Sequence, residues 1–184
     1  MIQVFFGSEF LPLVVKEIQG AKEEILVVCY EWNWYEGQRT GTAQDVNREL
    51  AIASKRGVKV KALLHNESMR RALGKLNRNT ARHLRRAGAE VKMGNTRMTV
   101  HAKVWVFDRE RAVVGSHNIS SRAVGRNLEA GVLFDDRIEV LKVVEWFGEC
   151  GAEDLWSSQV KKLVIVIVLP IEIPSNPKDT ALDV

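Results

Sequence analysis

The chain has 184 residues, enough for one domain with a sizeable core. Its 46% hydrophobic and 27% charged residues are typical of a soluble globular protein and argue against a disordered or fibrous chain. The net charge of +4 conceals a basic block at 55–97, where Glu67 and Glu90 are the only acids, followed by an acidic stretch at 129–154. The basic block favours a polyanionic partner, and a solvated helix face is the alternative.

Apolar runs and helical periodicities alternate along the chain. The apolar or alternating runs predict strands at 2–6, 24–30, 58–64, 90–93, 100–107, 112–114, 128–134 and 162–169. The helical periodicities predict helices at 8–20, 42–56, 68–87 and 136–147, the third with an apolar face of Leu73, Leu76, Leu84 and Ala87. This order implies an α/β fold with a β-sheet sandwiched between helices on both faces, and the short connection from 107 to 112 makes the sheet mixed. We expect a single domain at 1–170 and a flexible tail at 171–184.

The cysteines and the chain ends give no sign of secretion or membrane spanning. Cys29 lies in the apolar run 25–30, which predicts a buried thiol, and its spacing from Cys150 matches no zinc or redox motif. The N-terminus lacks a basic segment followed by a long apolar one, and the apolar run at 162–169 is too short to span a bilayer. We therefore expect a cytoplasmic protein without stable membrane insertion.

Two groups of side chains are candidates for contacting a polyanion. The aromatic loop after the strand at 24–30 contains Trp32 and Trp34, which stack on bases or wall a pocket in one interpretation and pack onto the core in the other. Arg82 and Arg85 lie on the basic helix and are candidate phosphate contacts. The nearby His83 is expected to be solvated.

The stretch 99–129 carries a candidate phosphate site. The alternation at 100–107 places His101, Lys103 and Trp105 on one face of a strand. A nucleophilic imidazole and an ammonium two residues apart suit an anion. The Gly115-Ser116 pair ends the neighbouring strand and offers N–H and hydroxyl donors.

The motif in this stretch resembles the HKD motif of the phospholipase D superfamily. His101, Lys103 and Asp108 stand in the spacing H-x-K-x-x-x-x-D, followed by a G-S-x-N turn that ends at Asn118, and then by Asn127 and Glu129. The resemblance covers residues 1 to about 170 and implies the mixed sheet between helical layers that the strand order also predicts.

The resemblance implies a role for each motif residue. His101 would be the nucleophile that forms a phosphohistidine intermediate, and Lys103 and Asn118 would bind the phosphate oxygens. Ser116 would add a hydroxyl donor, and Glu129 would hold a histidine ring nitrogen. Asp108 would be a supporting residue, with a salt bridge or a turn cap as the alternative.

The chain carries this motif once, whereas double-length members of the family carry it twice. The resemblance therefore implies a homodimer in which both copies of His101 share one active site. His117 occupies the variable position of G-S-x-N, and we expect it to flank the site and contact substrate. Lysine and asparagine supply the electrostatic stabilisation, so neither a metal nor a cofactor is expected.

The resemblance and the basic block together favour a metal-independent phosphodiesterase, most of all a nuclease that cleaves DNA or RNA. One alternative is a phosphodiesterase or transferase that acts on phospholipids. The other is a nucleic-acid-binding module with little catalysis.

Overall fold

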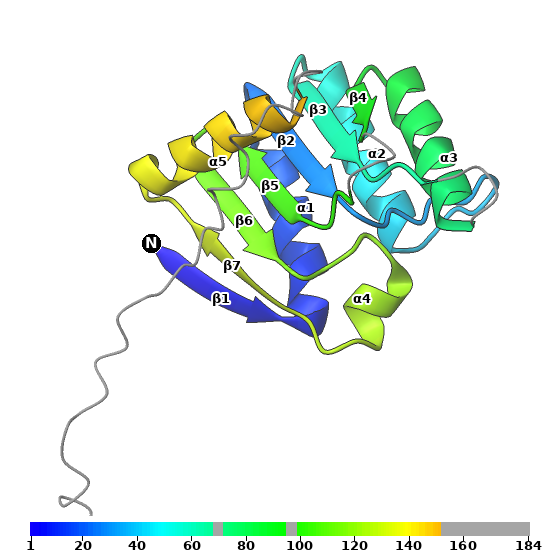
Figure 1. The fold of residues 1–184 in the computed structure, drawn as a ribbon, viewed down its shortest axis with the longest axis horizontal. Coiled ribbons are helices and arrows are strands. Elements are labelled where there is room, and N and C mark those ends of the chain that lie inside the picture. The colour runs from blue at the N-terminus through cyan, green and yellow to red at the C-terminus, as the bar shows by residue number, and fades with distance from the viewer. Residues whose placement is uncertain (68–71, 95–98, 152–184) are drawn as a thin grey trace, which may run out of the picture. The chain divides into compact units, whose positions relative to one another are not determined.

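The computed structural model describes residues 1–67, 72–94 and 99–151, and these residues contain a seven-stranded sheet (Figure 1). The strands are β1 (Ile2–Phe6), β2 (Glu24–Cys29), β3 (Lys59–Leu64), β4 (Glu90–Met93), β5 (Lys103–Phe107), β6 (Arg111–Gly115) and β7 (Ala130–Phe134). Their order is β1-β7-β6-β5-β2-β3-β4. β2, β3 and β4 are parallel and all other pairs are antiparallel, which confirms the mixed sheet. The predicted strand at 162–169 and the tail at 171–184 lie outside the described residues.

Helices cover both faces of the sheet, as predicted. The helical segments are a 3-10 turn η1 (Gly7–Glu9), α1 (Phe10–Gly20), α2 (Thr42–Lys55), α3 (Ala72–Arg86), α4 (Ser121–Gly125) and α5 (Arg137–Gly151). The first three α-helices pack on one face, and α5 packs on the other against β6, β5 and β2. The sequence did not predict α4, whose five residues are too few for a periodicity; the Ser120 hydroxyl accepts from the Ala123 N–H at its start.

The central strand β2 is apolar from Ile25 to Cys29 because both of its faces are covered. Ile25 and Val27 pack toward α1, α2 and α3, whereas Leu26 and Val28 pack toward α5. A strand covered on both faces has no exposed positions to fill with polar residues. Cys29, at the end of the strand, is buried and unpaired, in agreement with the predicted buried thiol.

Helix α3 differs from the prediction in the face that it buries. Of the expected apolar face only Leu84 is fully buried, whereas Leu73, Leu76 and Ala87 are half-buried. The fully buried positions include Asn77 and Thr80, two polar side chains. Hydrogen bonds from these two side chains to neighbouring loops offset the cost of burying them. The buried face of α3 therefore includes polar side chains and differs from the leucine face that the sequence predicted.

Candidate active site

Four strand ends meet at one edge of the sheet and bring the motif residues together. Lys103 opens β5 and lies opposite Gly115, which closes β6 and lies opposite Gly131 near the start of β7. The carboxyl end of β2 is the other neighbour of β5. Gly115 is required here, because an added Cβ would come within 2.8 Å of the Ala130 carbonyl oxygen.

His101 and Lys103 lie against each other, as the strand alternation predicted. The Lys103 Nζ is 3.3 Å from Nδ1 and 3.4 Å from Nε2 of His101, and it donates to the His101 carbonyl at 2.6 Å. His101 is exposed and lies in the loop before β5. That strand begins at Lys103, three residues after the start of the predicted strand at 100–107. An imidazole and an ammonium therefore face the same point in space.

The Lys103 ammonium is poised to bind an anion. Its side chain is only 7% exposed, and burial lowers the pKa of Lys103 while the carboxylates of Glu129 and Glu31 partly oppose that change. Among the described residues, no carboxylate lies within ion-pair distance of this ammonium. A phosphate oxygen would supply the missing negative charge.

Ser116 and Asn127 orient the Glu129 carboxylate. The Ser116 hydroxyl donates to Oε2 and the Asn127 amide donates to Oε1 at 2.9 Å. The Ser116 N–H donates to the Ala130 carbonyl, and the Gly7 N–H donates to the Glu129 carbonyl. Within the described part of the chain these donors, rather than an imidazole, hold the carboxylate that the resemblance assigned to a histidine.

Asn118 is fixed so that its amide nitrogen is available to a ligand. Its Oδ1 accepts from the Glu31 N–H at 3.1 Å, and the next residue, Ile119, bonds to the same loop through its own N–H and carbonyl. This arrangement sets the orientation of the amide. In the described residues Nδ2 has no hydrogen-bond partner, which suits the expected role of a phosphate-oxygen donor.

His117 does not flank the site, which corrects the sequence prediction. Its ring is 1% exposed, stacks on Phe10 at 4.6 Å and lies 5.4 Å from the ring of Phe5. Nε2 donates to the Gly7 carbonyl at 3.1 Å, and burial lowers the pKa of His117. It is a neutral core histidine that joins the G-S-x-N turn to α1.

Trp32 is a core residue too, so its assignment to substrate binding is also wrong. The side chain is fully buried and its ring lies 5.9 Å from that of Trp105. The backbone of Trp32 is bonded to helix α3 on both sides: its N–H donates to Asn77, and its carbonyl accepts from the Thr80 hydroxyl. The aromatic loop is thus anchored by its first tryptophan.

Trp34 lies beside the basic helix α3. It is half-buried and stacks on His83 at 4.2 Å, so His83 is less solvated than the sequence indicated. A hollow of about 490 Å³ on the same helix is lined by Arg78, Ala81, Arg82, Arg85, Arg86 and Met93. Arg82 and Arg85 are both exposed. Arg82 donates to the Asn79 side chain, whereas Arg85 donates to the Val91 carbonyl and so braces α3 against β4.

Asp108 lies at the other end of β5 from His101, so the structure does not bring it to the site. Its carboxylate accepts from the N–H groups of Lys22, Glu23 and Glu24 at 2.8–3.0 Å. It caps the start of β2, in line with the turn-capping alternative. Burial acts to raise the pKa of Asp108, but the three backbone donors outweigh it and hold that pKa below its usual range.

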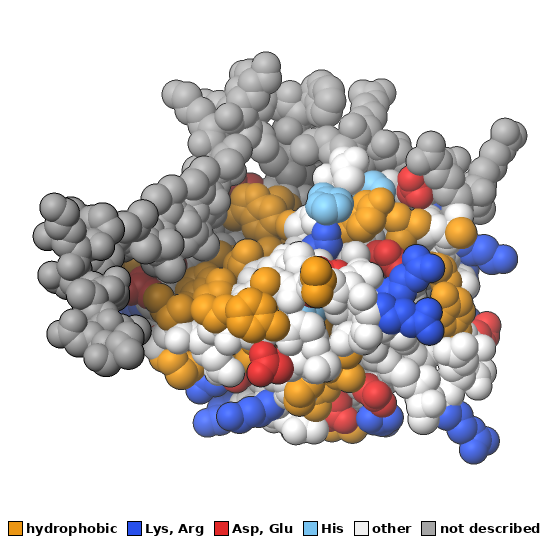
Figure 2. All heavy atoms as spheres, turned by 90° about the horizontal axis from the view of Figure 1, so that it is seen from below, with side chains coloured by type: hydrophobic (Ala, Val, Ile, Leu, Met, Phe, Trp, Pro, Cys, Tyr) orange, Lys and Arg blue, Asp and Glu red, His pale blue; other side chains and the backbone are white. Residues whose placement is uncertain are grey.

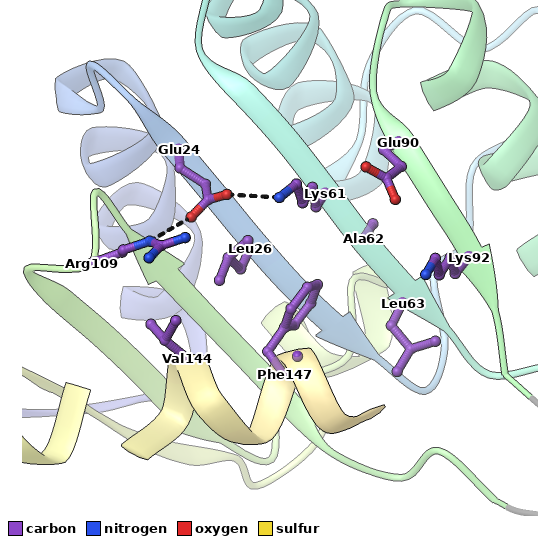
Figure 3. Close-up of a pocket in the computed structure, with 11 residues that line it drawn as sticks. Glu24, Leu26, Lys61, Ala62, Leu63, Glu90, Lys92, Arg109, Val144 and Phe147 are labelled. Atoms are coloured by element: carbon purple, nitrogen blue, oxygen red, sulfur yellow. Dashed lines mark hydrogen bonds and ion pairs between the residues drawn. The ribbon is translucent and has the colours of Figure 1, made fainter. Parts of the chain in front are cut away.

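The face of the sheet under α5 has a separate cleft of about 420 Å³ (Figure 3). Three of its charged groups are paired: Glu24 forms ion pairs with Lys61 and Arg109, both at 3.0 Å. Val144 and Phe147 of α5 form an apolar wall. None of the predicted site residues lines this cleft.

Two residues near His101 were missed as site residues. Tyr30, directly after β2, has its ring 4.8 Å from that of His101, and His65, directly after β3, stacks on Tyr30 at 4.9 Å. The sequence could have indicated both residues, because each directly follows one of two neighbouring parallel strands and the carboxyl ends of such strands share one edge of the sheet.

A family model described as "Cardiolipin synthase, PLD-like domain" matches residues 14–150. The chain belongs to the phospholipase D superfamily. It is 28% identical over 125 residues to a phospholipase D of Rickettsia prowazekii (strain Madrid E), covering 67% of this chain and 54% of that protein. The chain spans about half the length of the curated relatives it matches.

Solved structures share the fold. Nuc from Salmonella typhimurium, a phospholipase D family member, matches with a TM-score of 0.68 at 22% identity, over 82% of this chain and 93% of that one. NucT from Helicobacter pylori matches with a TM-score of 0.59 at 20% identity, over 82% and 94%. The mixed sheet with helices on both faces is thus the phospholipase D fold.

Within 1–67, 72–94 and 99–151, no helix has the length and apolar character needed to cross a membrane. The same residues hold no group of three or more histidine, cysteine, aspartate or glutamate side chains placed to bind a metal ion.

Proposed function

We propose that this chain is a metal-independent phosphodiesterase that cleaves nucleic acid through a phosphohistidine on His101. The observation that carries the proposal is the exposed His101 imidazole beside the buried Lys103 ammonium, with the Asn118 amide fixed nearby. The Lys103 ammonium and the Asn118 amide stabilise the charge that develops on the phosphate oxygens, a role that a metal ion fills in other phosphodiesterases.

The reaction proceeds in two displacements. A ring nitrogen of His101 attacks phosphorus and forms a P–N bond while the bond to the leaving oxygen breaks. That oxygen takes a proton from His101 of the partner subunit, acting as general acid. The same imidazole then deprotonates water, which attacks phosphorus, breaks the P–N bond and releases a phosphomonoester.

A homodimer supplies the second imidazole that this chemistry needs. Edge strand β1 exposes a row of apolar side chains, Ile2, Val4 and Phe6, which we call the β1 strip; Figure 2 looks onto this side of the molecule and shows hydrophobic side chains gathered there. Phe6 precedes Gly7, whose N–H bonds to Glu129, so the strip adjoins the site. Monomers rarely expose such surfaces without a partner.

Nucleic acid is the substrate that the surface charge favours. The hollow on α3 is lined by four arginines, and Trp34 stacks on His83 of the same helix. Arginines spaced along a helix suit successive backbone phosphates. Replacing Arg82 by glutamate should weaken binding of single-stranded DNA and reduce its salt dependence, whereas Arg137→Glu on α5 is the charge-matched control.

Phospholipids are the second candidate, because the family model is described by cardiolipin synthase and the Rickettsia relatives are named phospholipase D. Purified protein in EDTA is offered single-stranded DNA, duplex DNA, RNA, a nitrophenyl phosphodiester and a phosphatidyl substrate. The expected result is hydrolysis of nucleic acid, with a phosphohistidine on His101 that is isolated at alkaline pH and identified by mass spectrometry. Turnover of lipid alone favours the second candidate, and activity retained by His101→Ala contradicts both.

A further inference from the structure

We propose that Tyr30 and His65 are positioning residues of the active site, which together fix the ring and the loop of His101. The proposal rests on the proposed function, because it takes His101 as the reacting group. Three rings contact one another in sequence, and we call them the column. His65 stacks on Tyr30 at 4.9 Å, and the Tyr30 ring lies 4.8 Å from the His101 ring, tilted by 51°. The column links the carboxyl ends of β2 and β3 to the loop before β5.

Tyr30 contacts both groups that would handle the phosphate. Besides His101, the Lys103 Nζ lies 5.2 Å from the centroid of the Tyr30 ring. The face of an aromatic ring attracts cations, so it favours the Lys103 ammonium and, once His101 is protonated, the imidazolium. The ring also restricts the rotamers that the exposed His101 side chain can adopt.

His65 holds the backbone of the same loop. Its side chain is only 6% exposed, and its Nδ1 accepts from the Val100 N–H at 3.3 Å, one residue before His101. Its carbonyl accepts from the buried Asn77 amide, which fixes His65 in turn. His65 can accept this bond only in its neutral form, with the proton on Nε2.

The surroundings of His65 keep it neutral at ordinary pH. Burial lowers the pKa of His65, the charge of His101 lowers it further, and Glu67 opposes both. Tyr30 covers one ring face. Protonation of Nδ1 would turn this acceptor into a donor that faces the Val100 N–H, and the hydrogen bond would be lost. Low pH should therefore loosen the loop that carries His101.

Paired variants separate the two contacts. Tyr30→Phe keeps the ring and should retain kcat within about twofold, whereas Tyr30→Leu should lower kcat about tenfold with little change in KM. His65→Asn keeps an acceptor at the Nδ1 position and should retain most of kcat. His65→Phe keeps the stack but not the acceptor, and should lower kcat about tenfold, the same direction as Tyr30→Leu.

NMR spectra of the four histidines test the contact between Tyr30 and His101 without any turnover, and the pH profile of kcat tests His65 separately. In wild type the ring protons of His101 should be shifted upfield by Tyr30. In Tyr30→Leu that shift should vanish, because His101 loses its aromatic neighbour. In His65→Asn, where this titrating group is absent, the acid limb of the kcat profile should move to lower pH.

The outcomes for the two proposals differ. If wild type hydrolyses none of the substrates, the proposed function fails, and the chemical shifts of the His101 ring protons alone decide whether Tyr30 holds that ring. If wild type is active and both Tyr30→Leu and His65→Phe keep its kcat, the positioning proposal is overturned. An unshifted His101 signal in wild type overturns it as well.

Discussion

The motif spacing H-x-K-x-x-x-x-D divides its residues between two ends of strand β5. His101 and Lys103 lie together at the start of the strand, whereas Asp108 follows its end and adopts a positive φ of 53°. Its carboxylate accepts from three consecutive backbone N–H groups at the start of β2. The proposed chemistry therefore uses the end of the motif at the start of the strand, whereas Asp108 at the other end contributes hydrogen bonds to the fold.

Replacing Asp108 by asparagine should destabilise the fold by about 1–3 kcal/mol at neutral pH, since hydrogen bonds to a charged group are stronger than neutral ones. Asparagine tolerates the same backbone conformation, so the change isolates the charge. The pKa of Asp108 is lowered in the folded state, so its stabilisation is present above the unfolded pKa and is lost as pH falls through the folded one. Urea unfolding should show a difference at pH 7 that shrinks below about pH 4. A constant difference would contradict this account.

The residues that the sequence predicted well are those whose place follows from local alternation. His101 and Lys103 share a side of the chain because they are two residues apart, and no distant contact is needed to foresee it. Trp32 and His117 were assigned wrongly because their burial depends on partners far along the chain. His117 is buried by Phe5 and Phe10, more than 100 residues earlier, and single-sequence patterns carry no such information.

Helix α3 ties the loops of the candidate site to the sheet. Asn77 is fully buried and uses its whole amide: Oδ1 accepts from the Trp32 N–H, and Nδ2 donates to the carbonyls of Tyr30 and His65. One side chain thus joins the loops that follow β2 and β3. The strands were foreseen from their apolar runs, but this polar docking of α3 was not, because the leucine pattern suggested a different face.

We expect Asn77→Ala to cost about 2–4 kcal/mol in unfolding free energy, because it leaves three buried backbone groups without a partner. The loss should also loosen Tyr30 and His65, so kcat should fall even in the folded fraction. Asn79→Ala is the matched control, since Asn79 is half-buried on the same helix and contacts the exposed Arg82. Denaturant unfolding and turnover at low temperature measure both effects. Equal stability of the two variants would count against the docking role.

The described residues leave one face of the sheet partly uncovered. Helix α5 packs on β6, β5 and β2, and the β1 strip beyond it stays exposed, with Val4 at 60% and Phe6 at 62%. Val4→Lys should shift the protein from dimer to monomer and reduce turnover in parallel. Gln3→Lys adds the same charge on the opposite side of the strand and should leave the dimer intact. Sedimentation velocity distinguishes the two, and a Val4→Lys dimer with full activity would place the interface elsewhere.

Sharing of one active site by two subunits has a quantitative signature. Wild type and His101→Ala are mixed in equal amounts and left to exchange subunits, at a fixed total concentration. If each dimer needs both copies of His101, only wild-type homodimers act, and activity falls to about one quarter of that of wild type alone; independent sites give about one half. Unmixed samples pooled just before the assay are the control and should give one half in either case. Because one motif supplies a single nucleophilic imidazole and the chemistry uses two, we expect one quarter.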